Sequence, residues 1–265
     1  MSWKIKVFGK KLKLNKPILI EGLPGIGNVG KVAVDFMIDE LKAVKLYELF
    51  SYTFPHSVFV NEKNLVELPS IEIYYKKMEN GKDLLLLAGD VQPIDEVSCY
   101  EFSEKILDII EENKGSEIIT LGGIGLESVP KKPKVYCTGN SRKLIDSYKK
   151  GTNVNEELHG IVGPIVGVSG LLLGLAARRN IPAIAFLAET YGHPMFLGVK
   201  GAREILKILN KKLKLDIKLK ELDKEIKELE TELMKRTENL SEVSKQTAIK
   251  KLKGKIGGEE TSYIG

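Results

Sequence analysis

The stretch Pro17–Gly30, PILIEGLPGIGNVG, restricts the possible fold more than any other part of this chain. Its apolar run Ile18–Ile20 is typical of a buried parallel strand. Asn28 is then placed to cap a helix whose apolar residues recur from Val29 to Leu41. The turn between strand and helix, together with the helix start, is rich in glycine: Gly22, Gly25, Gly27 and Gly30. The stretch therefore predicts the strand, tight turn and helix from which α/β folds are built.

Three of these glycines, Gly25, Gly27 and Gly30, also match G-x-G-x-x-G, in which backbone amides at a helix N-terminus face a pyrophosphate. That fingerprint needs an acidic residue about twenty positions on, at the end of a second strand, to hold a ribose. The candidate, Glu48, lies inside the apolar run Val44–Phe50 instead. We therefore interpret the glycine loop as structural and expect no cofactor. Nucleotide or small-molecule binding at the Gly25–Gly30 loop is kept as the alternative.

Further strands and helices alternate along the chain. Helices are expected at Val97–Ile110, after a capping Ser141, at Ser169–Arg179 and at Ala202–Leu209. Two hairpins are expected as well, one joining Trp3–Val7 to Leu12–Leu14 and one around the turn at 61–64. Strands are expected at Val44–Phe50, Leu84–Ala88, Ile118–Leu121, Val135–Cys137 and Ala183–Leu187, and Ile161–Val166 precedes the helix at Ser169–Arg179. The order predicts an α/β fold: a mostly parallel sheet flanked by helices on both faces, with added hairpins.

Three motifs in this order carry a family resemblance. They are GLPGIGNVGKVAVDFMIDEL from Gly22, LGGIG at Leu121–Gly125, and GVSGLLLGLAARRNIPAIAFLAET within Gly163–Glu189. The region of about 15–210 resembles the PAC2 family, the proteasome assembly chaperones and their archaeal relatives. The resemblance implies an α/β fold and a scaffolding role on the proteasome, with no known chemistry.

Composition narrows the class of protein. A chain of 265 residues can bury a full core, and two cysteines make neither a disulfide framework nor a zinc set. The N-terminus has no signal-peptide pattern and no apolar run reaches membrane-spanning length, so a cytoplasmic protein without a membrane partner is expected. The net charge of +5 permits nucleic acid binding. We favour a solvated, lysine-rich helix face instead.

The C-terminal part changes character from about residue 213. Apolar residues there follow heptad spacing: Leu215, Leu219, Leu222, Ile226, Leu229 and Leu233. Such a seam predicts a coiled-coil helix that packs on a partner helix, in a hairpin with a later helix or in a homo-oligomer, although an amphipathic helix lying on its own domain is an alternative. The predicted division is an α/β domain over 1–212, a helical extension over 213–253 and a flexible tail over 254–265.

Candidates for chemistry are few. GVSGL at Gly167–Leu171 nearly matches a nucleophile elbow but has Leu171 at its last position, so Ser169 is interpreted as a helix N-cap. Three histidines show no metal-ligand spacing. Asp90, the Gly122–Gly125 run and His193 follow predicted strands and should share the carboxyl edge of the sheet, where α/β proteins bind small molecules. Ordinary turn chemistry explains them equally, and we expect no catalytic residue and no metal site.

The last residues form the candidate partner-binding site. In the family that the chain resembles, many members end in hydrophobic–Tyr–any residue, a tail that inserts between α-subunits of the 20S proteasome. Here Tyr263 is third from the end and is followed by Ile264 and Gly265. The shifted motif still offers an aromatic docking element on a glycine-rich segment. We expect a non-enzymatic, homo-oligomeric factor that binds the 20S α-ring through these residues, assisting assembly or activating the particle.

Overall fold

The computed structural model describes residues 3–9, 12–79, 81–158, 163–194, 196–224 and 226. The strands are β1 (Trp3–Val7), β2 (Ile18–Glu21), β3 (Val44–Ser51), β4 (Phe59–Val60), β5 (Val66–Glu67), β6 (Ile71–Lys76), β7 (Leu84–Gly89), β8 (Glu117–Leu126), β9 (Val135–Gly139) and β10 (Ala183–Tyr191). The helices are the 3-10 turn η1 (Ile26–Asn28), α1 (Val29–Leu41), α2 (Glu96–Glu112), α3 (Arg142–Lys149), α4 (Val168–Arg178) and α5 (Val199–Leu213). The chain divides into two compact units, Met1–Leu219 and Lys220–Gly265, and all of these strands and helices lie in the first unit.

Eight strands form one sheet in the order β1-β3-β6-β7-β2-β8-β10-β9. Its four central strands, β7, β2, β8 and β10, are parallel. The pairings that flank them, from β1 through β3 and β6 to β7 on one side and β10 to β9 on the other, are antiparallel. The expected α/β fold is therefore confirmed, but the sheet is parallel only at its centre, because short connections such as that between β6 and β7 force antiparallel neighbours.

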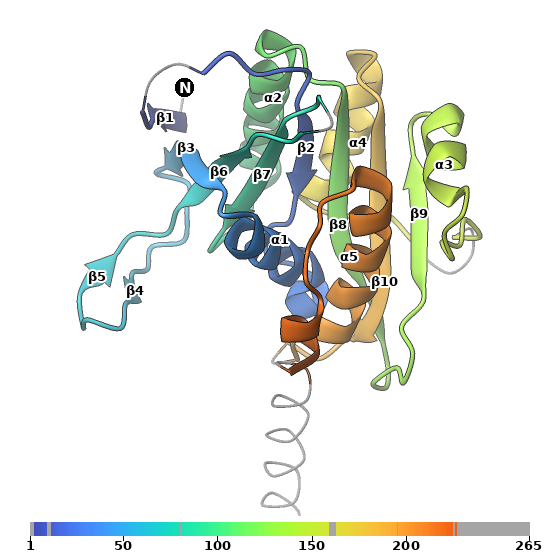
Figure 1. Ribbon diagram of the computed structural model, residues 1–265. Coiled ribbons are helices and arrows are strands. Elements are labelled where there is room, and N and C mark those ends of the chain that lie inside the picture. Colours follow the sequence, from blue (N-terminus) through green and yellow to red (C-terminus); the bar gives the residue numbers. More distant parts are fainter. Residues whose placement is uncertain are drawn as a thin grey trace, which may run out of the picture. The chain divides into compact units, whose positions relative to one another are not determined.

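Helices cover both faces of the sheet, as expected (Figure 1). The helix α2 packs against α4 on one face, and α1 packs against α5 on the other. Alternate residues of β7 serve the two layers: Leu85 and Leu87 join the core cluster that contains Phe102 of α2, while Leu84 and Leu86 are buried on the opposite face. A strand buried on both faces needs apolar side chains at every position, which explains the run LLLLA.

The expected hairpin at the N-terminus is wrong. The strand β1 pairs with β3, with Trp3 opposite Ser51, and residues 12–15 form no strand. The Trp3 ring packs against Phe54 at 5.4 Å and against Phe102 at 4.8 Å between ring centroids. This aromatic cluster holds β1 at the edge of the main sheet, far along the chain from the residues expected to pair with it.

The second expected hairpin is present as the two-stranded sheet of β4 and β5. It is separate from the main sheet. The stretch Leu65–Ile73 after the turn does not form one strand, because Pro69 has no amide hydrogen to donate to a sheet ladder. The strand β6 therefore begins at Ile71 and pairs with β3 and β7.

The later part of the predicted coiled-coil extension, from residue 227 on, lies outside the described residues. Leu215 is buried within the first unit and Leu219 is half-buried. Leu222 and Ile226, in the second unit, are buried. Leu229, Leu233 and the tail Tyr263–Gly265 are not described.

Candidate functional site

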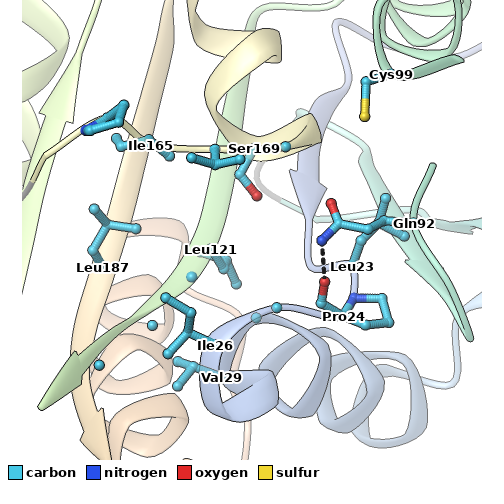
Figure 2. Close-up of a pocket in the computed structure, with 18 of the residues that line it drawn as sticks. Leu23, Pro24, Ile26, Val29, Gln92, Cys99, Leu121, Ile165, Ser169 and Leu187 are labelled. Carbon is cyan, nitrogen blue, oxygen red and sulfur yellow. Dashed lines mark hydrogen bonds between the residues drawn. The ribbon is translucent and has the colours of Figure 1, made fainter. Parts of the chain in front are cut away.

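A cavity of about 800 Å³ lies at the carboxyl edge of the parallel strands (Figure 2). Its lining comes from within segments 23–30, 92–100, 121–125 and 163–169 and from Leu187. These segments hold the starts of α1, α2 and α4, on opposite faces of the sheet. Ligands of open α/β sheets usually bind at such a crossing point, so this cavity, which we call the edge cavity, is the candidate site.

The edge cavity is largely apolar. Figure 2 shows Leu23, Leu121 and Leu187 around it. The amide Nε2 of Gln92 donates a hydrogen bond to the carbonyl oxygen of Pro24 at 2.7 Å. That bond ties the loop after β7 to the glycine loop after β2 and fixes one wall of the edge cavity.

The glycine loop forms another wall, and its glycines permit close packing. A Cβ at Gly30 would lie 2.3 Å from the carbonyl oxygen of Leu121, and one at Gly22 would lie 2.2 Å from that of Gly30. Gly27 has a φ of +59° and faces Thr190, whereas Gly25 has open space around it. Asn28 does not cap α1 through its side chain; its Oδ1 accepts from the amide of Gly25 at 3.3 Å instead. The loop is thus pressed against β8 and β10.

Glu48 does not support the nucleotide fingerprint. It lies within β3, as the sequence predicts, and its carboxylate is 3.7 Å from Nζ of Lys45. In the sheet, β6 and β7 separate β3 from β2. A dinucleotide site would need the acidic residue on a strand beside β2, so the ribose contact is missing from this geometry.

A buried carboxyl lies next to the edge cavity. Glu21, the last residue of β2, is fully buried, and its oxygens accept hydrogen bonds from the amide of Leu23 and from Oγ of Ser169, both at 2.9 Å. Burial raises the pKa of this carboxyl to about 7, because the two hydrogen bonds only partly offset the loss of water. Sequence reasoning missed Glu21, although an acidic residue directly after a buried apolar run is a detectable signal.

Ser169 is not the N-cap of α4, contrary to expectation. The helix begins at Val168, and Gly167 with a φ of +83° is its N-cap. The Ser169 hydroxyl donates to Glu21 instead. The cap expected at Ser141 is confirmed, since its Oγ accepts from the amide of Leu144 at 3.4 Å.

The other sequence candidates separate into two groups. Gly122–Gly125 line the edge cavity, but Asp90, Glu189 and His193 do not. Glu189 accepts from the amide of Lys134 at 2.9 Å and from the Tyr136 hydroxyl at 3.2 Å, and Tyr191 stacks on His193. The two hydrogen bonds of Glu189 join β10 to β9, whereas the stacking of Tyr191 on His193 is local.

Both cysteines are buried and free. Cys99 lines the edge cavity, and its Sγ donates to the carbonyl oxygen of Pro93 at 3.1 Å. Burial raises the pKa of Cys99, and it raises that of Cys137 to about 11, so neither is activated as a thiolate. Among the residues that the structure describes, no group of three or more His, Cys, Asp or Glu could hold a metal, and no helix could span a membrane.

Comparisons with known proteins agree with this architecture. The family model described as PAC2 family matches residues 19–237. An uncharacterized protein of Methanocaldococcus jannaschii is 31% identical over 228 residues, which are 83% of this chain and 84% of that protein.

Two solved structures from Pyrococcus furiosus are similar in fold. PbaB, described as an archaeal proteasome activator, is 36% identical with a TM-score of 0.81, covering 88% of this chain and 98% of that chain. PbaA, described as an archaeal homolog of proteasome-assembly chaperone, is 22% identical with a TM-score of 0.75, covering 94% and 98%.

Proposed function

Because this chain belongs to the PAC2 family, we propose that it is a non-enzymatic, homo-oligomeric factor that binds the α-ring of the 20S proteasome as an assembly chaperone or activator. The observation that carries this proposal is the 36% identity to PbaB, an archaeal proteasome activator, over almost the whole of that protein. The M. jannaschii relative extends the similarity across a second archaeon without adding a function.

The chemistry around the edge cavity supports a binding role over catalysis. The one hydroxyl that resembled a nucleophile, that of Ser169, donates to a buried carboxyl. The Cys99 thiol has a raised pKa and donates to a backbone carbonyl. A nucleotide at the Gly25–Gly30 loop is disfavoured because Gly27 and Gly30 are pressed against Thr190 and Leu121.

The proposed docking element is the tail Tyr263, Ile264 and Gly265. Burial of each large apolar side chain contributes roughly 1.5–3 kcal/mol, so Tyr263 and Ile264 give one tail only a few kcal/mol. Ordering the segment costs part of that gain, so a single tail should bind weakly. A homo-oligomer that presents several tails gains affinity through effective concentration when their spacing fits the ring.

The test is a pull-down of archaeal 20S core particles with the full chain and with a variant that ends at Ser262. We expect the deletion to weaken binding by well over tenfold, and Tyr263→Ala to account for most of the loss. Ser262→Ala is the matched control and should bind like the full chain. Equal binding by the truncated variant would exclude the tail as the docking element, and no binding by any version would overturn the proposed function.

A further inference from the structure

The segment 58–68, which we call the arm, extends away from the main sheet and contains β4 and β5 (Figure 1). Six of its large apolar side chains are exposed: Val58, Phe59, Val60, Leu65, Val66 and Leu68. Together they leave on the order of 600 Å² of surface in water, divided between the two sides of the arm. Such a surface marks a contact with another macromolecule.

The register of the arm defines its contact face. Val60 lies directly opposite Val66, so both point to the same side. Val58 and Leu68 lie two residues away, just outside the two strands, and we infer their place on that side from the two-residue period. These four residues, called the arm face, carry no polar side chain among them. The opposite side is mixed, because Phe59 lies opposite Glu67.

The tip of the arm is a polar turn. The Oδ1 of Asn61 accepts from the amides of Lys63 at 2.9 Å and Leu65 at 3.0 Å, which closes a polar turn. The arm therefore offers its flat face, and not its tip, to a partner. A two-stranded hairpin is marginally stable alone, so packing of this face against an apolar surface would also stabilise the arm.

The edge cavity provides a surface of matching chemistry. Its rim carries exposed apolar side chains, of which Ile94 is 74% and Val166 is 82% exposed, and Ile26 and Tyr100 are exposed beside them. No residue of the arm, all of which is described, lines the edge cavity of its own chain. Each chain thus presents two apolar surfaces, the arm face and the edge cavity, that do not cover each other.

We propose that the arm face of one copy covers the edge cavity of the next copy, so that arm and cavity form the subunit contact of the homo-oligomer; this rests on the oligomeric part of the proposed function. A head-to-tail contact of this kind covers both surfaces on every copy when the ring closes. Pairing of one arm with another arm would leave the rim of the edge cavity in water. The four residues of the arm face expose on the order of 400 Å², about half of the roughly 800 Å² that each partner buries in a standard interface.

The test uses the full chain in two versions. One carries an affinity tag and the substitution Val60→Cys in the arm, and the other carries no tag and the substitution Ile94→Cys at the rim of the edge cavity. Mixed under mild oxidation, they should form a disulfide between the tagged and untagged versions. Both versions also carry Cys99→Ala, because the native Cys99 thiol lines the edge cavity, whereas Cys137 is buried elsewhere. Lys63→Cys at the polar tip is the matched control and should cross-link at least tenfold less. Disulfides between two tagged copies would overturn the proposal in favour of arm pairing.

A second measurement is independent of cross-linking. Val60→Glu should reduce the mass measured by light scattering to that of the monomer, while Lys63→Glu leaves it unchanged; circular dichroism checks that both fold. If the oligomer persists with Val60→Glu, the proposed arm contact is overturned and the proposed function is not. If this variant also loses proteasome binding, the arm contacts the proteasome and not a second copy. A monomeric wild type overturns the oligomeric part of the proposed function as well.

Discussion

The strand β7 and the arm contain the same kind of residue in opposite environments. Leu84–Leu87 are almost completely buried, whereas Val60 and Val66 are about two-thirds exposed. The difference comes from what covers each strand. β7 lies between two strands and between two helical layers, and the arm extends beyond both layers (Figure 1). Apolar content thus identifies a surface that must be covered, and the topology decides whether the chain covers it itself.

Apolar side chains therefore have two different roles in this molecule. At the centre of the sheet they determine the free energy of unfolding, and on the arm they are available for association. Variants should therefore separate the two, with large losses of stability at the centre and small ones on the arm.

The largest loss of stability is expected at Gly30, where the neighbouring backbone leaves no room for a side chain. Gly30→Val places its Cβ 2.3 Å from the Leu121 carbonyl oxygen, and a backbone atom cannot move aside cheaply. We expect a destabilisation of about 5 kcal/mol or failure to fold, measured by urea unfolding and soluble yield. Gly25→Ala, in open space with extended backbone, is the control and should cost less than about 1 kcal/mol. Equal effects of the two would mean that the loop does not pack as described.

Truncation to alanine in β7 and in the arm compares the two regions directly. Leu86→Ala removes a fully buried side chain and should lower the free energy of unfolding by about 2–5 kcal/mol through lost burial and the cavity left behind. Val60→Ala, on the arm, should change it by less than about 0.5 kcal/mol in the monomer. Urea titrations at a protein concentration where the chain is monomeric give both values. A large effect at Val60 would show that the arm packs on its own chain.

Of the changes expected in the buried part of the sheet, the smallest concerns the carboxyl of Glu21. The folded-state pKa of Glu21 is raised from 4.5 to about 7, so between these pH values the folded state keeps a proton that the unfolded state releases. Stability therefore falls as pH rises from about 4.5 to 7, by up to about 3 kcal/mol, and this contribution is constant outside that window. Glu21→Gln, which is neutral throughout, should remove this slope from the unfolding free energy measured against pH. An unchanged slope in the variant would place the titrating group elsewhere.

The sequence predicts the elements that depend on local pattern. Ile18–Ile20 and Leu84–Ala88 are continuous apolar runs, and both are central strands. The capping residue Ser141 is likewise a local signal. The pairing of β1 with β3 is not predictable in this way, because alternation in Trp3–Val7 shows that a strand exists but carries no information about which distant strand it joins.

The candidate site is predictable only in part. The Gly122–Gly125 run at the carboxyl edge can be identified because strand ends share an edge in a parallel sheet. The contacts of Gln92 and Ser169 cannot be found in this way, because the chain brings both residues beside the glycine loop from far along the sequence. Glu21 follows an apolar run that marks the strand, and its burial depends on α4, whose start lies almost 150 residues later.

The position of β2 has a consequence for synthesis on the ribosome. Ile18 is synthesised well before its partners, Leu84 on one side and Glu117 on the other. β7 can pair with one edge of β2 once it has emerged, but the other edge stays unpaired until β8 has left the exit tunnel, and α4, which helps to cover the sheet, is made later still. A nascent chain in this state is prone to aggregation, and pairing across such sequence separations is slow. Pauses in translation before residue 126 should therefore lower the yield of folded protein more than pauses after it.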